Sequence, residues 1–109
     1  MSETKLNVNQ INSPIVVNAT STTLEVVANT VYKYSSAINS LTISSVEVSD
    51  YESVIYFTTG AGTNGVVSFT DTSNLSWGGG STPTLEPNTK YCIAICNGYA
   101  EIDNFGTVS

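Results

Sequence analysis

Apolar and polar residues alternate along most of this chain with a period of two, and no stretch shows the period of a helix. A period of two is typical of strands that bury one face. About eight or nine short strands can be read from the pattern, with turn signals roughly every 8–12 residues between them. The sequence therefore predicts an all-β fold, namely a single antiparallel β-sandwich or barrel-like domain.

The strongest single signal is a hairpin within residues 84–102. Pro87 and Asn88 favour a chain reversal, and an alternating strand follows over residues 90–96. Asn97-Gly98 then supplies the two positive-φ residues of a type I′ turn, so that residues 99–102 pair back. This turn sets the register, with Cys96 opposite Tyr99, Ile95 opposite Ala100, Ala94 opposite Glu101 and Ile93 opposite Ile102.

The predicted register gives the hairpin two different faces. The face expected in the core is formed by Tyr91, Ile93, Ile95, Ala100 and Ile102. The opposite face is formed by Cys92, Ala94, Cys96, Tyr99 and Glu101. Because this second face is too apolar for open solvent, we expect it to contact another layer or another subunit. Cys92, Ala94 and Cys96 are the candidate subunit-interface residues.

The remaining strands are less sharply defined. They are expected at residues 23–28, 31–35, 41–48, 51–59 and 66–70, with a short strand at 75–77 and a last edge strand at 105–109. The apolar alternation changes phase between Ile43 and Val46, which predicts a β-bulge or bend. Two glycine-rich segments, at 60–65 and 78–81, are expected to be loops.

The first part of the chain differs from the rest. Residues 1–22 contain short apolar pieces separated by Asn and Ser, with Pro14 between them. Two interpretations stay open: short edge strands, or an extended arm that orders on a partner. We expect residues 1–22 to be an N-terminal arm or edge strands that serve for attachment, and residues 23–109 to form the β-sandwich domain.

One short motif occurs twice. Leu24-Glu25 precedes Asn29-Thr30-Val31-Tyr32, and Leu85-Glu86 precedes Asn88-Thr89-Lys90-Tyr91, with spacings that differ by two residues. The Asn-Thr-x-Tyr copies lie 59 positions apart, from Asn29 to Asn88. A duplicated turn-and-strand and a repeated use of the same turn chemistry both explain this, and the second is the simpler explanation.

The composition narrows the set of partners. Ser, Thr and Asn supply 41 residues, whereas only 12 residues are charged, and the net charge is −6 with three lysines and no arginine. Such a surface has no phosphate-binding footprint, so nucleic acid is not an expected partner. No stretch approaches the roughly 20 apolar residues of a membrane span, and the start has no secretory signal pattern. No membrane partner is expected.

The sequence contains few residues that could serve in catalysis or metal binding. The chain has no histidine, which excludes Ser–His and Cys–His activation. The carboxylates of Asp50 and Glu52 are close in sequence, but solvated turn acids explain them better than a glycosidase pair. Cys92 and Cys96 lack further zinc ligands, and four residues apart on one strand they are too distant to bridge. No catalytic, cofactor-binding or metal-binding residue is predicted, and the thiols should be free.

The aromatic residues are the better binding candidates. Tyrosine and tryptophan rings can form a platform on which sugars stack, and neighbouring Asn and Asp side chains can supply hydrogen bonds. Trp77, Tyr99 and Tyr51 are the candidate contacts for a glycan or a protein partner. The alternative, which we favour for the set as a whole, is that these rings lie at the rim of a small sandwich core with their polar ends in water.

Several segments together resemble a small β domain of virion proteins from tailed phages, particularly phages of gut bacteria. The resemblance is carried by Asn29-Thr30-Val31-Tyr32, Ser40-Leu41-Thr42-Ile43, Ile55-Tyr56-Phe57-Thr58-Thr59-Gly60, Trp77 and Leu85-Glu86-Pro87-Asn88-Thr89-Lys90-Tyr91 running into Asn97-Gly98-Tyr99. It covers roughly residues 24–102, and it consists of turn-and-strand patterns without a reactive signature. The domain occurs on head fibres, auxiliary capsid proteins and tail-associated proteins.

The resemblance implies a structural or adhesive role, often as a trimer. We therefore expect a non-enzymatic virion protein, displayed on the capsid as a head fibre or decoration protein, made in the host cytoplasm and then located in the virion. The expected partners are the major capsid protein or other virion proteins, reached through residues 1–22, and further copies of the chain. The alternative function is a carbohydrate-binding or host-adhesion module that contacts surface glycans.

Overall fold

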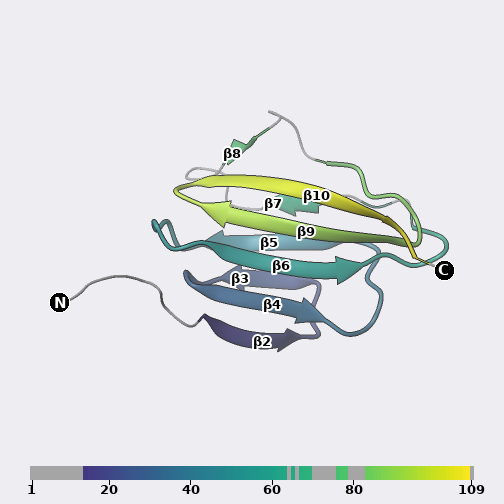
Figure 1. The fold of residues 1–109 in the computed structure, drawn as a ribbon, viewed down its shortest axis with the longest axis horizontal. Coiled ribbons are helices and arrows are strands. Elements are labelled where there is room, and N and C mark those ends of the chain that lie inside the picture. Colours follow the sequence, from purple (N-terminus) through teal and green to yellow (C-terminus); the bar gives the residue numbers. More distant parts are fainter. Residues whose placement is uncertain (1–13, 64, 66, 70–75, 79–82, 109) are drawn as a thin grey trace.

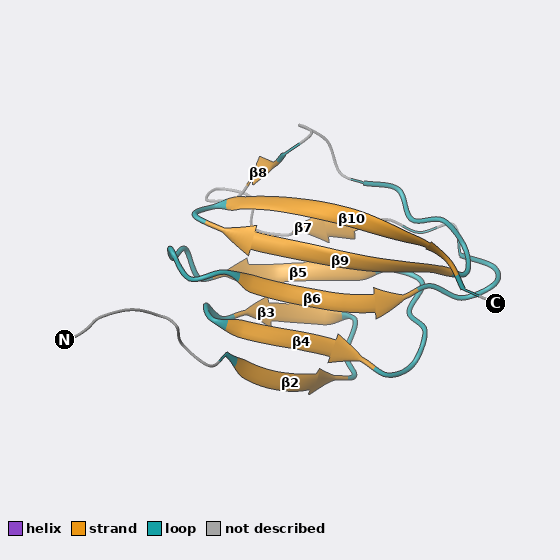
Figure 2. Ribbon diagram, in the orientation of Figure 1, coloured by secondary structure: helices purple, strands orange, loops and turns teal. Residues whose placement is uncertain are grey.

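A computed structural model describes residues 14–63, 65, 67–69, 76–78 and 83–108. The described residues form strands and loops and contain no helix, so the fold is predominantly β (Figure 2). The strands are β2 (Ile15–Ala19), β3 (Thr23–Val26), β4 (Thr30–Tyr34), β5 (Leu41–Val46), β6 (Ser53–Thr58), β7 (Val67–Phe69), β8 (Ser76–Trp77), β9 (Thr89–Cys96) and β10 (Tyr99–Thr107).

The strands form two sheets that lie one behind the other (Figure 1). The larger sheet has the order β2-β4-β6-β9-β10-β8, and the smaller sheet has the order β3-β5-β7. From β2 to β7 the chain changes sheet after every strand, so that even-numbered strands enter the large sheet and odd-numbered strands enter the small one. The hairpin of β9 and β10 then extends the large sheet beside β6.

The expectation of an antiparallel fold is wrong for most strand pairs. The pairs β2–β4, β4–β6, β3–β5, β5–β7 and β8–β10 are parallel, and only β6–β9 and β9–β10 are antiparallel. For the four parallel pairs within β2 to β7, the reason is the alternation between sheets. Each visit to the other sheet acts as a crossover connection, which brings the chain back in its original direction. Neither sheet closes on itself in the described part of the chain, so a barrel is not formed there.

One hydrophobic cluster takes residues from both sheets. Fully buried side chains come from β5 of the small sheet (Leu41 and Ile43) and from β6 and β9 of the large sheet (Ile55 and Ile93). Leu85, in the segment that leads to β9, is buried in the same cluster. The core therefore lies between the sheets, and each strand contributes the side chains of one face.

The predicted hairpin is confirmed. Asn97 and Gly98 have φ values of 55° and 80°, as a type I′ turn requires. The register places Cys96 opposite Tyr99 and Ile93 opposite Ile102, as expected. The predicted core face is buried, except that Ile102 is only half-buried.

The predicted irregularity after Ile43 is also confirmed. In the pairing of β3 with β5, Leu24 lies opposite Ile43 but Glu25 lies opposite Ser45, so Ser44 is the extra residue of a bulge. The last edge strand, in contrast, is not separate, because β10 continues to Thr107. The short strand around Trp77 is present as β8.

Residues 15–19 form an edge strand. They make up β2, which pairs in parallel with β4 at one edge of the large sheet. Residues 1–13 lie outside the described residues, as does most of the glycine-rich segment at 78–81. The division of the chain at residue 22 stays a prediction.

The two Asn-Thr-x-Tyr copies have the same local structure. Asn29 and Asn88 both have positive φ, at 56° and 51°. The hydroxyls of Thr30 and Thr89 each donate to the carbonyl two residues earlier, at 3.1 and 2.8 Å. The copies begin β4 and β9, the two strands that flank β6.

The tyrosine of each copy closes the turn in the same way. The backbone N–H groups of Val27 and Glu86 donate to the hydroxyl oxygens of Tyr32 and Tyr91, each at 2.8 Å. Both rings are buried, and each hydroxyl satisfies a backbone donor that precedes its turn. We call these two units the tyrosine corners. They fix where β4 and β9 begin.

We expect Ile93→Ala to lower the free energy of unfolding by about 2–5 kcal/mol, because the fully buried side chain would leave a cavity. Ile15→Ala is the matched control, since Ile15 is 63% exposed, and should cost less than about 1 kcal/mol. Urea unfolding followed by tryptophan fluorescence measures both values. Equal losses in the two variants would contradict the placement of the core.

Candidate functional site

The large sheet has an outer face directed away from the small sheet. Its side chains form rows across the strands, because register partners lie on the same face. One row is apolar over four neighbouring strands and consists of Val16, Val31, Val54 and Ala94. We call these four residues the apolar row. Val16 is 56% exposed and the other three are half-buried, so the row presents an unbroken apolar strip.

The neighbouring row is polar. It consists of Asn18, Lys33, Tyr56, Cys92 and Asp103, one residue from each of five adjacent strands. Lys33 and Asp103 are exposed, and they lie on opposite sides of Tyr56 and Cys92. The outer face therefore changes from apolar to polar over two residues along each strand.

The predicted interface residues lie on this outer face of β9, but they differ in exposure. Ala94 and Cys96 are half-buried, whereas Cys92 is only 8% exposed. Cys92 lies opposite Tyr56 in the register of β6 and β9, and burial beneath neighbouring side chains leaves it little surface to offer a partner. Of the three candidates, Ala94 and Cys96 are the ones within reach of another molecule.

Ala94, Cys96 and Tyr99 come together at one hollow. The hollow has a volume of about 460 Å³ and is also lined by Glu52, Asn97 and Glu101. Tyr99 is 63% exposed beside it. Two of the three candidate interface residues and one of the candidate aromatic contacts thus share one site.

The other two aromatic candidates lie elsewhere. Tyr51 is 56% exposed in the segment before β6. Trp77 is half-buried and packs against the hydrophobic core, on the opposite face of the sheet from Tyr99. Its ring is therefore placed as a core-rim residue, and the three aromatics do not form one platform.

Both cysteines are free thiols, as expected. The Cys96 thiol donates to the carbonyl of Asp50 at 3.3 Å. Burial raises the pKa of Cys92, and the carboxylates of Asp103 and Glu52 raise it further. Burial, Glu52 and Asp50 likewise raise the pKa of Cys96. Both sites disfavour the thiolate, which is the reactive form.

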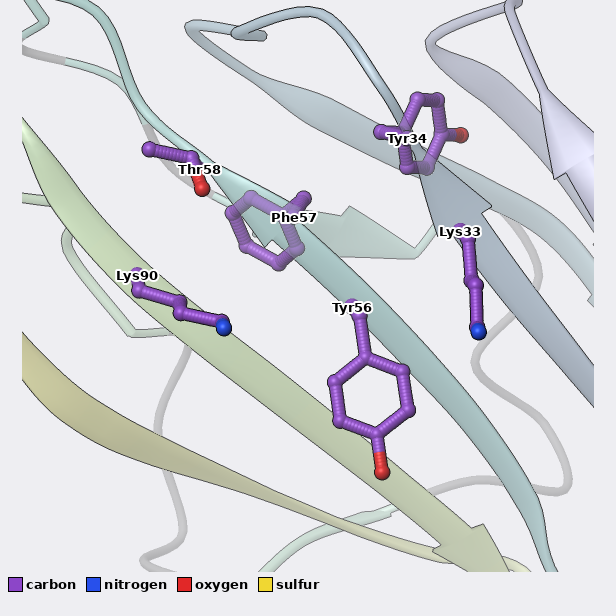
Figure 3. A pocket seen from close by; sticks show the side chains of 6 residues that line it. All are labelled: Lys33, Tyr34, Tyr56, Phe57, Thr58 and Lys90. Atoms are coloured by element: carbon purple, nitrogen blue, oxygen red, sulfur yellow. The ribbon is translucent and has the colours of Figure 1, made fainter.

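A second pocket lies over β4, β6 and β9 and was not found from the sequence. It has a volume of about 480 Å³ and is lined by Lys33, Tyr34, Tyr56, Phe57, Thr58 and Lys90 (Figure 3). The sequence does show that Lys33 and Lys90 are two of only three cations. It does not show that β4 and β9 flank β6, and this strand order is what brings the two lysines to one pocket.

The described residues contain no group of three or more His, Cys, Asp or Glu side chains arranged to hold a metal ion. The same residues form no helix long and apolar enough to cross a bilayer. The outer face of the large sheet offers exposed tyrosines, the apolar row, hydroxyl groups and the ammonium groups of Lys33 and Lys90.

Comparisons of the chain with protein-family models, with curated proteins and with solved structures find no match.

We expect both thiols to titrate at higher pH than the roughly 8.5 of a free cysteine. The physical reason is that burial and nearby carboxylates disfavour the thiolate, so the proton is lost only at higher pH. The measurement is the rate of iodoacetamide alkylation against pH in the single-thiol variants Cys92→Ala and Cys96→Ala. The same variants unfolded in urea serve as the control, and a folded midpoint at or below the unfolded one would contradict the expectation.

Proposed function

We propose that this protein is a non-enzymatic structural component of a phage virion, displayed on the capsid as a head fibre or decoration protein. The resemblance of residues 24–102 to virion β domains supports this proposal. So does a surface rich in Ser, Thr and Asn, which carries few charges and suits a domain exposed to the medium. The finer fold assignment belongs to the same proposal: a two-layer β-sandwich.

The observation that carries the proposal is the apolar row on the outer face of the large sheet. Val16, Val31, Val54 and Ala94 continue across β2, β4, β6 and β9 without a charged residue between them. A contiguous apolar strip on a small protein marks a surface that meets another protein. A component that assembles with other virion proteins needs such a surface, whereas an independent secreted enzyme does not.

The proposal assigns residues 1–22 to attachment and residues 23–109 to the displayed domain. β2, which contains residues 15–19 of the attachment part, lies at the edge of the large sheet and not at its centre (Figure 1). The partners would be the major capsid protein or other virion proteins. The location would be the virion, after synthesis in the host cytoplasm.

A second candidate function is a carbohydrate-binding or host-adhesion module. The observation in its favour is that two of the candidate rings are strongly exposed, Tyr99 at 63% and Tyr51 at 56%. Exposed tyrosine rings stack on the apolar faces of sugars while the hydroxyl groups accept and donate hydrogen bonds. The two functions are compatible, because a displayed domain can also hold a particle near glycans.

If the chain is a capsid component, mass spectrometry of purified phage particles should find it at tens to hundreds of copies per particle. Quantification against the major capsid protein, with isotope-labelled peptides of both chains, gives the copy number. A host cytoplasmic protein quantified in the same particles is the control for carry-over. Absence from purified virions, with the protein present in the infected-cell lysate, would reject the proposal.

We also propose that the protein is a homo-oligomer, most simply a trimer. The outer face of the large sheet and the exposed edges of both sheets leave apolar and hydrogen-bonding groups that closed symmetric association would cover. Val16, Ala94 and Cys96 lie on the face that would meet a second copy. The number three comes from the resemblance to virion proteins and not from the residues of this face.

We expect the purified protein to scatter light as a particle of about 34.5 kDa, three times its 11.5 kDa. Ala94→Lys should shift the mass towards 11.5 kDa, because a charge in the apolar row would be buried without a partner in the interface. Thr23→Lys is the matched control, since it places the same charge at an exposed position of the small sheet. A wild-type mass of 11.5 kDa at tens of micromolar would reject stable self-association.

A further inference from the structure

Two of the three lysines of the chain flank one tyrosine on the outer face of the large sheet. Lys33 of β4 lies opposite Tyr56 of β6, and Lys90 of β9 lies opposite Thr58 of β6. Tyr56 and Thr58 are two residues apart on one strand and so share a face. Figure 3 shows the Tyr56 side chain standing between those of Lys33 and Lys90.

The two lysines give this pocket a local charge opposite to that of the protein. The chain has nine acidic residues and a net charge of −6, yet neither ammonium group forms an ion pair with any carboxylate in the part of the chain that the structure describes. From strand spacing and rise, the two Cα positions are roughly 12 Å apart, so both flexible side chains can reach one small anion between them. The site is therefore suited to a ligand with one localised negative charge.

The strands that carry the pocket are held from their other face, where the ring of Phe57 lies in the core and that of Tyr34 packs against it. The Phe57 ring stacks on Tyr91 at a centroid distance of 5.4 Å, and the Tyr34 hydroxyl donates to the carbonyl of Ser21 at 2.6 Å. Burial raises the pKa of Tyr34, which keeps this hydroxyl protonated and its bond intact. The Tyr56 ring, 38% exposed, is the surface left free for contact. Strands held in this way require little ordering when a ligand binds on their outer face.

These groups together match a sugar that carries an acid group. The exposed ring of Tyr56 can stack on the C–H face of a pyranose, and the hydroxyls of Tyr56 and Thr58 can bond to its hydroxyl groups. Lys33 and Lys90 complement a carboxylate or a sulfate. A nucleic acid fits less well, because its repeated phosphates would meet the net charge of −6 on both sides of this small basic site.

We propose that the pocket between β4, β6 and β9 binds an acidic saccharide, with Lys33 and Lys90 holding the carboxylate or sulfate group and Tyr56 stacking on the sugar ring. This proposal deepens the glycan-binding candidate function and rests on it, and it is independent of whether the chain is a virion component. A sugar with a carboxylate and a sugar with a sulfate both fit this description, because each is a pyranose with one anionic group. The experiment distinguishes the carboxylate from the sulfate.

The test is an NMR titration of the full-length protein with galacturonate, galactose 6-sulfate and neutral galactose. We expect both acidic sugars, or one of them, to bind at least about tenfold more tightly than galactose, since only they use the lysines. Lys33→Gln and Lys90→Gln should each weaken binding about three- to fivefold, and the double variant about tenfold or more. The more tightly bound of the two acidic sugars identifies the anionic group.

Two controls separate a specific site from general charge and from misfolding. Lys5→Gln removes the same charge from the third lysine of the chain and should leave binding unchanged. Tyr56→Leu keeps an apolar side chain but removes the aromatic face, and it should weaken the binding of both acidic sugars. The variants of Lys33, Lys90 and Tyr56 should melt within about 2 °C of the wild type, because these three side chains are exposed.

Each contrary result has a definite meaning. The pocket proposal is overturned if galactose binds as tightly as its acidic counterparts, or if the double lysine variant binds like the wild type. It is also overturned if a single-stranded oligonucleotide binds more tightly than any sugar and loses binding in the double variant. If glycan binding persists in the double variant but is lost in Tyr99→Ala, the pocket proposal fails while the glycan-binding function stands. If no sugar binds at about 10 mM, both fail.

Discussion

The structure depends on the burial of one face of the large sheet against the small sheet. The most deeply buried side chains, such as Ile55 and Ile93 on one side and Leu41 and Ile43 on the other, belong to a single cluster that neither sheet can form alone. From β2 to β7 each strand enters the sheet that the previous strand did not, so each of the four parallel pairs among these strands joins segments separated by a complete strand of the other sheet. Both layers must therefore form together, and pairing of this non-local kind makes folding cooperative and slow compared with that of a helical protein.

The tyrosine corners connect this core to the surface where binding is proposed. Lys33 follows the buried Tyr32, and Lys90 precedes the buried Tyr91. Since the side chains of successive strand residues point to opposite faces, a buried tyrosine directs its neighbouring lysine to the outer face. A slip of one residue in β4 or β9 would bury a lysine and expose a tyrosine, which the hydrogen bonds to the two tyrosine hydroxyls oppose. The geometry of the outer face is thus a consequence of how β4 and β9 begin.

The sequence was informative where short-range chemistry decides the structure. Asn97-Gly98 allowed the turn, the register and the two faces of the β9–β10 hairpin to be predicted, and the phase change after Ile43 located the bulge. It was uninformative about which strands become neighbours. The alternation of apolar and polar residues shows that a strand buries one face, but it does not show in which sheet the strand lies. The alternation is also the same for parallel and antiparallel pairing. The pocket at Lys33 and Lys90 depends on the order β4-β6-β9, so no local pattern could have indicated it. The interpretation favoured for the aromatic set, rings at the rim of the core, holds for Trp77. Which face of the sheet carries this ring depends on the pairing of β8 with β10, which the sequence does not show.

The apolar row and the lysine pocket lie in adjacent rows of the same sheet face, and this proximity connects the proposals made for each. Val31 is two residues from Lys33, and Val54 is two residues from Tyr56. If copies of the chain associate through the apolar row, their pockets lie at the rim of the interface and are not covered at its centre. An exposed pair of lysines and one tyrosine ring make only a few contacts with a single sugar, so each pocket binds weakly by itself. Several pockets held at fixed spacing in an oligomer, and many oligomers on one particle, convert such weak contacts into strong attachment to a surface that displays the sugar repeatedly. Weak binding at each copy is therefore consistent with a role in display, where the number of copies sets the overall strength.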